Sequence, residues 1–437
     1  MFETLKNAFK VKEIRIKIWM TLLFVLIYRI GCYIPVPGVG TGVFASELSQ
    51  VSYLNIMSMM TGGSLENGTW FAMGIGPYIN ASIIIQLLTV AIPALERLSK
   101  QGEEGQKKIA KYTRYGALIL AIIQAIGILV SYNSLITAST SSTALSEMLG
   151  GQTWLAYVIV VLFYASGALV TVWIGERITE YGVSNGISLL IFVGILATAG
   201  KYFVNTITTF VTNGFDLNVF WMLIGYIVAI ILVFGLIVWV ELAERKIPVQ
   251  YAKQVKGRKM YGGQSTVIPI KVNANGVMPL IFAFSILSFP ELIMTMFWSG
   301  SDFHRWWQQW MGTNSWLYMV VLALLILFFS FFYSQIQFNP DDISKTIQQN
   351  GGFILGIRPG KPTADYLKRI QRRITLFGAI FLAFSALVPA IVFKAIDASS
   401  SAVFSATGML IAVSVALEFN TALESQIMMK QYKGFLK

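Results

Sequence analysis

Two stretches nearly half the chain apart share one pattern: "GIGPYINASIII", residues 74–85, and "GVMPLIFAFSIL", residues 276–287. In both, a glycine is followed by a β-branched residue, and a proline, an isoleucine and an alanine recur in register. Gly/Pro-interrupted apolar segments at matching positions are typical of membrane proteins built from two related halves. The pattern therefore predicts an internal repeat whose copies lie on equivalent helices of the two halves.

The composition places these helices in a membrane. Of the 437 residues, 55% are hydrophobic and 12% are charged, against about 25% charged in ordinary soluble domains. Ten continuous apolar runs are each about long enough to cross a hydrocarbon core of about 30 Å, and continuous runs favour helices over barrel strands. They lie near 18–36, 74–93, 115–132, 154–174, 186–204, 217–240, 276–297, 315–337, 375–396 and 403–423. We expect an all-α polytopic membrane protein of ten transmembrane helices, with halves at 1–215 and 216–437.

The basic residues orient the chain. Of 33 Lys and Arg, 29 lie in alternate loops or termini on one side, three lie on the other, and Arg29 lies in the first run. The positive-inside rule makes the basic side cytoplasmic, so both termini are cytoplasmic and the five-helix halves are inverted. Attraction to anionic lipid explains part of this charge. The cytoplasmic loops 241–271 and 339–373 are also unusually long, and long loops are commonly functional, so we expect them to dock on a large, negatively charged partner.

Several chemistries are excluded. With one cysteine, Cys32, and one histidine, His304, the chain offers neither an internal disulfide nor a His/Cys metal site, and we expect no metal or cofactor. The segment "LGIRPGKP", 355–362, lacks the first glycine of a phosphate-binding loop. On the opposite side, Trp306, Trp307 and Trp310 of "HRWWQQWMG" fit an interfacial aromatic belt.

Apolar runs that are almost free of charge suit a channel that passes cargo of varied chemistry. Two other classes of membrane protein remain possible. A small-solute transporter is also commonly an inverted repeat, but it normally carries ionisable residues inside the membrane, and these runs are almost free of them. A membrane-embedded enzyme would need a cluster of catalytic side chains, which a single histidine does not suggest. Copurification with a small helical subunit would separate the channel from both.

Longer motifs resemble one family. They are "YRIGCYIPVPGV" (28–39), "GIGPYINASIIIQLLTVAIP" (74–93), "GEEGQKKIAKYTRYG" (102–116), "GERITEYGVSNGISLLIF" (175–192), "GGQSTVIPIKVNANGVMP" (262–279) and "FNPDDISKTIQQNGGFILGIRPGKPT" (338–363). The chain resembles the SecY family, the channel subunits of the bacterial protein translocase, over almost its whole length; the outer loops 133–153 and 298–315 match only in outline. The resemblance implies a clamshell of helices 1–5 and 6–10. It also implies an hourglass pore for unfolded secretory polypeptides, and a lateral gate between helices 2–3 and 7–8 that releases transmembrane segments into lipid.

The resemblance also implies site residues. The pore ring would be Ile75, Ile79, Ile187, Ile191, Ile281 and Ile411. A plug at about 60–72 would include Thr61, Gly62, Gly63, Ser64, Leu65, Glu66, Asn67 and Gly68, and because small residues bury little surface we expect it to be weakly held. Polar residues at membrane depth, Gln86 and Gln124 together with Asn273, would lie near the lateral gate, and Arg258, Lys259 and Arg358 would dock a motor or ribosome.

The implied partners follow from the same resemblance. The SecA motor ATPase or the ribosome would supply the energy that this non-enzymatic chain lacks, with salt-sensitive contacts to ribosomal RNA. SecE would hold the two halves together, and SecG would be peripheral. Signal peptides, nascent polypeptides and membrane lipid would meet at the gate of a multi-pass protein in the bacterial plasma membrane.

Overall fold

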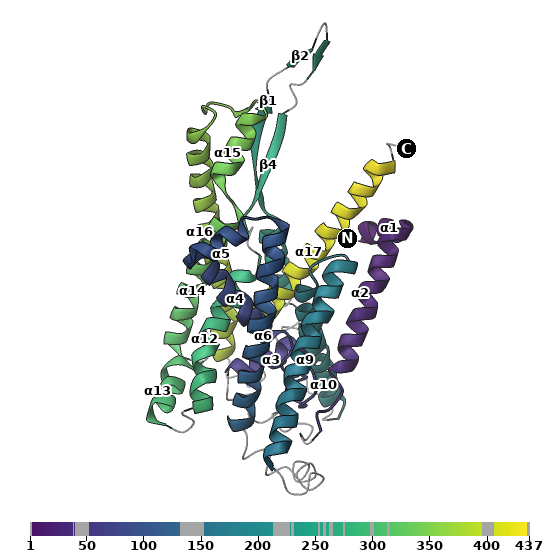
Figure 1. The fold of residues 1–437 in the computed structure, drawn as a ribbon, viewed down its shortest axis with the longest axis vertical. Helices are drawn as coiled ribbons and strands as arrows, with labels where there is room; N and C mark the ends of the chain where they lie inside the picture. Colours follow the sequence, from purple (N-terminus) through teal and green to yellow (C-terminus); the bar gives the residue numbers. More distant parts are fainter. Residues whose placement is uncertain are drawn as a thin grey trace. The chain divides into compact units, whose positions relative to one another are not determined.

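The computed structural model (Figure 1) describes residues 2–37, 39, 52–131, 153–212, 228, 231–251, 254–256, 259–261, 265–273, 276–297, 301–312, 315–395 and 406–434. Its contacts divide the chain into two units. The first comprises Met1–Phe220, Ser285–Ser315 and Ala398–Lys437, and the second comprises Trp221–Phe284 and Trp316–Asp397. The predicted boundary between residues 215 and 216 lies outside the described residues.

Each of the ten apolar runs overlaps a helix, which confirms the predicted all-α membrane fold. The helices are α2 (Lys12–Gly31), α4 (Gly76–Ala91), α6 (Glu103–Ser131), α9 (Thr153–Tyr181), α10 (Gly186–Thr212), a helix over Ile231–Glu241, α12 (Met278–Phe297), α14 (Trp316–Gln337), α16 (Lys361–Ala395) and α17 (Ala406–Gly434). Within the described residues, four helices are long and apolar enough to cross a membrane, or five if the bent pair α4 and α5 forms one span. The count of ten spans stays a prediction.

Proline sets both ends of α4, the first copy of the repeat. Pro77 occupies the first turn, where its missing N–H costs nothing and its fixed φ suits a helix. At the other end Ile92 is extended, and Pro93 starts α5 (Pro93–Ser99) at a bend of 106°, because proline cannot continue the hydrogen-bond ladder. The Gly/Pro marks of the repeat therefore define the start of α4, and a second proline defines its end.

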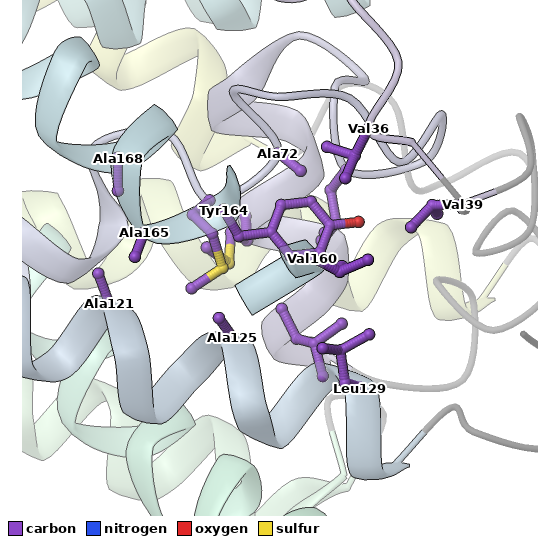
Figure 2. Packing of buried hydrophobic residues seen from close by; sticks show 14 residues of the cluster. Val36, Val39, Ala72, Ala121, Ala125, Leu129, Val160, Tyr164, Ala165 and Ala168 are labelled. Carbon is purple, nitrogen blue, oxygen red and sulfur yellow. The ribbon is translucent and has the colours of Figure 1, made fainter. Parts of the chain in front are cut away.

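Small residues bring α6 and α9 together in the first unit. Ala121 and Ala125 of α6 face Ala165 and Ala168 of α9 (Figure 2), and all four are buried. Lipid provides no hydrophobic drive between helices, so close backbone approach over small side chains supplies the packing instead. The ring of Tyr164 fills the space at one end of this contact, beside Val160 and Leu129.

The two long basic loops fold into one small domain in the second unit. Strand β1 (Glu244–Tyr251) pairs antiparallel with β4 (Ser265–Lys271) and with β5 (Gly352–Ile354), giving the order β4-β1-β5. Figure 1 shows β1 and β4 as a long ribbon beside α15 (Pro340–Gln349) and α16. Beyond them, β2 (Gln254–Lys256) pairs with β3 (Lys259–Tyr261).

This domain has its own apolar core. Buried strand residues pack against Ile347 of α15 and against Leu367 and Ile370 of α16; the strand residues are Ile247, Val249, Ile270 and Ile354. The sequence predicts loops over 241–271 and 339–373, and the strands within them differ from that prediction. Prolines inside both long strands, Pro248 and Pro269, together with the dense charge, conceal the alternation of apolar residues.

Candidate pore, plug and docking surface

The predicted plug begins where a short helix ends. Helix α3 (Ser52–Thr61) stops at Thr61, and Gly62 and Gly63 then take φ values of 70° and 84°. Gly68 has φ 59°. Side chains with a Cβ rarely adopt this left-handed region, so the glycines are needed for the compact turn that the segment makes.

The segment 61–68 packs into the first unit through one buried leucine and two side-chain hydrogen bonds. Leu65 is only 1% exposed and belongs to the apolar cluster of α6 and α9. Ser64 is equally buried, and its hydroxyl donates to the Cys32 carbonyl at 3.4 Å, while the Thr69 hydroxyl donates to the Ser64 carbonyl at 3.1 Å. Small residues let the backbone enter a tight site in which one leucine is fully buried, and the expectation of a weakly held segment stays a prediction.

Two helix glycines allow the backbone on either side of segment 61–68 to approach closely, at Met60 and at Trp70. A Cβ on Gly194 of α10 would overlap the Met60 carbonyl oxygen, and one on Gly167 of α9 would overlap the Trp70 carbonyl oxygen. The Trp70 indole also donates to the Ser166 hydroxyl at 3.1 Å. Sequence reasoning missed both glycines, although an isolated glycine inside a long helix is a signal of close backbone approach.

One ion pair ties the segment to α10. The Lys201 ammonium lies 2.9 Å from a Glu66 carboxylate oxygen, with the two side chains 49% and 34% exposed. Lys201 lies near the end of the fifth apolar run, on the predicted side that carries only three basic residues. Its contact with Glu66 gives that isolated charge a structural partner.

The predicted ring isoleucines occupy helix starts and buried helix faces. Ile75 caps α4, and the Ile79 amide donates to the Ile75 carbonyl at 3.0 Å, so the two lie one turn apart on the same face. Ile191 and Ile411 are buried in α10 and α17, which pack against each other, whereas Ile187 is half-buried against Gly175 of α9.

The sixth isoleucine belongs to the other unit. Ile281 is buried in the first turns of α12, within the part of that helix assigned to the second unit. The structure thus brings ring candidates together in pairs, Ile75 with Ile79 and Ile187 with Ile191, one helical turn apart. The complete ring stays a prediction.

The three polar gate candidates differ in the hydrogen bonds that their side-chain amides make. Gln86 of α4 is half-buried and donates to the Ser82 hydroxyl at 3.3 Å. Gln124 of α6 is 1% exposed, and its side-chain nitrogen and oxygen have no hydrogen-bond partner among the described residues. Asn273 precedes α12 and donates to Glu241 at 2.7 Å, which closes the base of the β1–β4 ribbon. Their place at the gate stays a prediction.

Arg358, the predicted docking arginine of the second loop, lies on a turn held by two side-chain hydrogen bonds. Arg358 is exposed between β5 and α16, where Gly356 and Gly360 have positive φ. The Thr363 hydroxyl donates to the Arg358 carbonyl at 2.9 Å, and the buried Ser344 hydroxyl donates to the Gly360 carbonyl at 2.7 Å. No ion pair involves Arg358 among the described residues, so its guanidinium is available to a partner.

Of the other two docking candidates, the structure describes the backbone of Lys259. The Lys259 backbone pairs with Lys256 at the end of β2 and β3, and Arg258 lies outside the described residues. Across the described part of the chain, no group of His, Cys, Asp and Glu side chains could hold a metal ion.

Comparisons with known proteins identify the family and the fold of the chain. A family model described as SecY matches residues 69–420. Over the full length of both chains, the protein is 40% identical to the protein translocase subunit SecY of Streptomyces coelicolor. Its fold matches a solved structure described as a protein conducting channel with a TM-score of 0.67 and 18% identity, covering 95% of this chain and 92% of that one.

A second solved structure, Sec61 in the canine ribosome-channel complex from the endoplasmic reticulum, matches with a TM-score of 0.64 and 17% identity over 94% of this chain and 92% of that one. The fold is thus that of a polytopic helical channel. The chain belongs to the SecY family, and it is a membrane-embedded channel subunit of a protein translocase.

Proposed function

We propose that residues 61–68 are a displaceable plug that closes a polypeptide channel, and that the burial of Leu65 carries this assignment. The segment leads directly into α4, whose first turn presents Ile75 and Ile79. Its anchors are one apolar side chain, a few hydrogen bonds and one exposed ion pair. These contacts are strong enough to hold a closed state, and they can be exchanged when a polypeptide enters.

The six isoleucines form the seal beneath this plug. Branched aliphatic side chains fit around a passing chain of any sequence without hydrogen-bonding to it, and a dry apolar constriction resists ions by dewetting. Pairs one helical turn apart on α4 and on α10 would give each helix two contacts with the translocating chain. Plug and ring are each partial barriers, and the closed channel needs both.

Gln86 and Gln124 mark the lateral gate, with Asn273 at the approach to α12. A polar amide that is buried without a partner costs free energy in an apolar setting, so the closed gate stores a penalty at Gln124. A signal peptide that parts the helices would relieve it. Signal peptides and nascent chains then pass from the pore to membrane lipid.

Energy comes from outside the chain. The exposed Arg358 and the basic hairpin with Arg258 and Lys259 would receive the SecA motor ATPase or the ribosome, SecE would hold the halves together, and SecG would bind peripherally. The Sec61 relative was solved in a ribosome-channel complex, which supports a ribosomal partner. By the charge distribution, both termini and this domain face the cytoplasm of a bacterial plasma membrane.

The function is tested with purified channel in planar bilayers. Deletion of 61–70 combined with Ile79→Asn and Ile191→Asn should raise resting ion conductance above that of either change alone, because polar side chains help to wet a narrow pore. Alanine at Leu196, an exposed α10 position, is the matched control and should leave conductance unchanged. If the combined variant conducts no more than the unmodified channel, the plug and the ring are both wrong.

Docking is tested separately in proteoliposomes. Arg358→Glu should cripple ATP-driven translocation while the protein still inserts, because charge reversal in a docked ion pair costs several kcal/mol. Lys345→Glu, an exposed cation on α15 of the same domain, controls for general loss of positive charge. Normal translocation by Arg358→Glu would remove this residue from the docking site.

A further inference from the structure

Helix α13 (Asp302–Met311) joins two apolar helices on the poorly charged side of the protein and has three different faces. Ser301 caps it by accepting a hydrogen bond from the His304 amide at 3.2 Å. Phe303, Trp306 and Trp310 are 57%, 49% and 50% exposed. Their i, i+3, i+7 spacing puts the three rings on one side of the helix.

The other residues of α13 divide into a side that packs on the protein and an exposed polar side. His304 is buried, and Trp307 and Met311 are half-buried, so this side packs on the protein. Arg305 and Gln309 are exposed on the side away from it. The sequence predicted a belt of three tryptophans, but Trp307 belongs to the packed side and Phe303 takes its place on the exposed aromatic face.

The two linkers that flank α13 are short and limit how far this helix can lie from α12 and α14. Four residues separate α13 from the end of α12 at Phe297, and four separate it from the start of α14 at Trp316. A linker of this length reaches at most about 18 Å when fully extended. With ten residues, α13 is itself only about 15 Å long, too short to cross the membrane, so each of its ends lies within the reach of one such linker from a neighbouring helix end.

The charge and ring geometry identify what meets the aromatic face. Arg305 pairs with Asp302 at 3.2 Å, so the two formal charges of the helix cancel. Phe303 and Trp306 stack with ring centroids 5.9 Å apart and an interplanar angle of 14°, which forms a flat, continuous apolar surface. Tryptophan-rich, low-charge surfaces favour the boundary between lipid headgroups and acyl chains.

We propose that α13 is an interfacial anchor whose Phe303, Trp306 and Trp310 face inserts into the headgroup–acyl boundary of the outer leaflet. The anchor sets the depth of the outer end of α12, to which it is tied by four residues. Because the helix carries no net charge, binding depends on the apolar boundary and not on anionic headgroups. The proposal requires the membrane setting of the chain but not the plug, the ring or any docking partner.

The chain contains one cysteine, Cys32, so a single substitution removes every native thiol and lets a label be placed at one chosen position. In a Cys32→Ala background, Phe303→Cys carries a nitroxide spin label in phosphatidylcholine nanodiscs, and Gln309→Cys on the polar side is the matched control. Collision rates are measured with oxygen, which concentrates in lipid, and with a water-soluble nickel chelate. The label at position 303 should favour oxygen severalfold, and the label at 309 should favour nickel.

Two further measurements separate the possible occupants of the face. Adding Trp306→Ala and Trp310→Ala should move the label at 303 toward nickel, whereas Gln308→Ala should not. Adding one-third phosphatidylglycerol to the nanodiscs should leave all values unchanged. A label at 303 that prefers nickel would show that the face lies in water, and a label shielded from both reagents would show that protein covers it; either result overturns the anchor.

Discussion

Replacing Leu65 with alanine should make the resting channel open more often. The side chain is fully buried in the cluster that also contains Val36, Ala125 and Tyr164. Truncation removes three carbons, and at about 0.8 kcal/mol for each buried CH₂ the closed state loses about 2.4 kcal/mol. Since about 1.4 kcal/mol corresponds to a factor of ten, the ratio of open to closed plug should rise about 50-fold.

The assay is single-channel recording in a planar bilayer without translocating substrate. The proposed isoleucine ring is unchanged in this variant, so the expected change is in the frequency of openings and not in their conductance. Leu65→Met keeps most of the volume and should cost the closed state less than about 1.5 kcal/mol. If Leu65→Ala opens no more often than Leu65→Met, the apolar anchor does not hold the plug, and the reasoning from burial fails.

Three further results are expected. Lys201→Gln removes the half-exposed pair with Glu66, worth up to about 1 kcal/mol; openings should increase up to about fivefold at low salt, and the difference from the unmodified channel should disappear at high salt. Gln124→Leu removes a buried, unpartnered amide and should raise thermal stability by about 1–3 kcal/mol while changing how hydrophobic a signal peptide must be for translocation; an unchanged melting temperature and signal threshold would contradict this. Burial lowers the pKa of His304 in α13, so its contribution to stability is complete above its unfolded pKa of about 6.5 and is lost as the pH falls through the folded value; melting curves should show acid sensitivity that His304→Gln abolishes.

The helices were predictable from the sequence because each relies on local information. Continuous apolar runs specify spans, and Gly76, Pro77 and Pro93 specify where α4 starts and stops. The SecY resemblance assigned the plug to its segment. The burial of Leu65 was not predictable, because the pocket for this side chain is assembled from residues about 30 positions before it and about 60 to 100 positions after it.

The strands were missed for a related reason. Val249 is buried only because β5, about 100 residues later, pairs with it and Leu367 covers it. A strand with charged neighbours and an internal proline carries too little local signal. The faces of α13 show the same limit, since the choice between Trp307 and Phe303 depends on what the helix packs against.

The hydrogen-bonded base of the β1–β4 ribbon determines how a force on the small β domain would reach the helices. The helix over Ile231–Glu241 enters β1 after two residues, the Val272 amide bonds to the Ala243 carbonyl at 2.9 Å, and Asn273 bonds to Glu241 at 2.7 Å. The eight residues of β1 extend about 26 Å from this base. A force applied at the far end of the ribbon therefore acts over this length. Its torque reaches the end of the helix over Ile231–Glu241 and the start of α12 together.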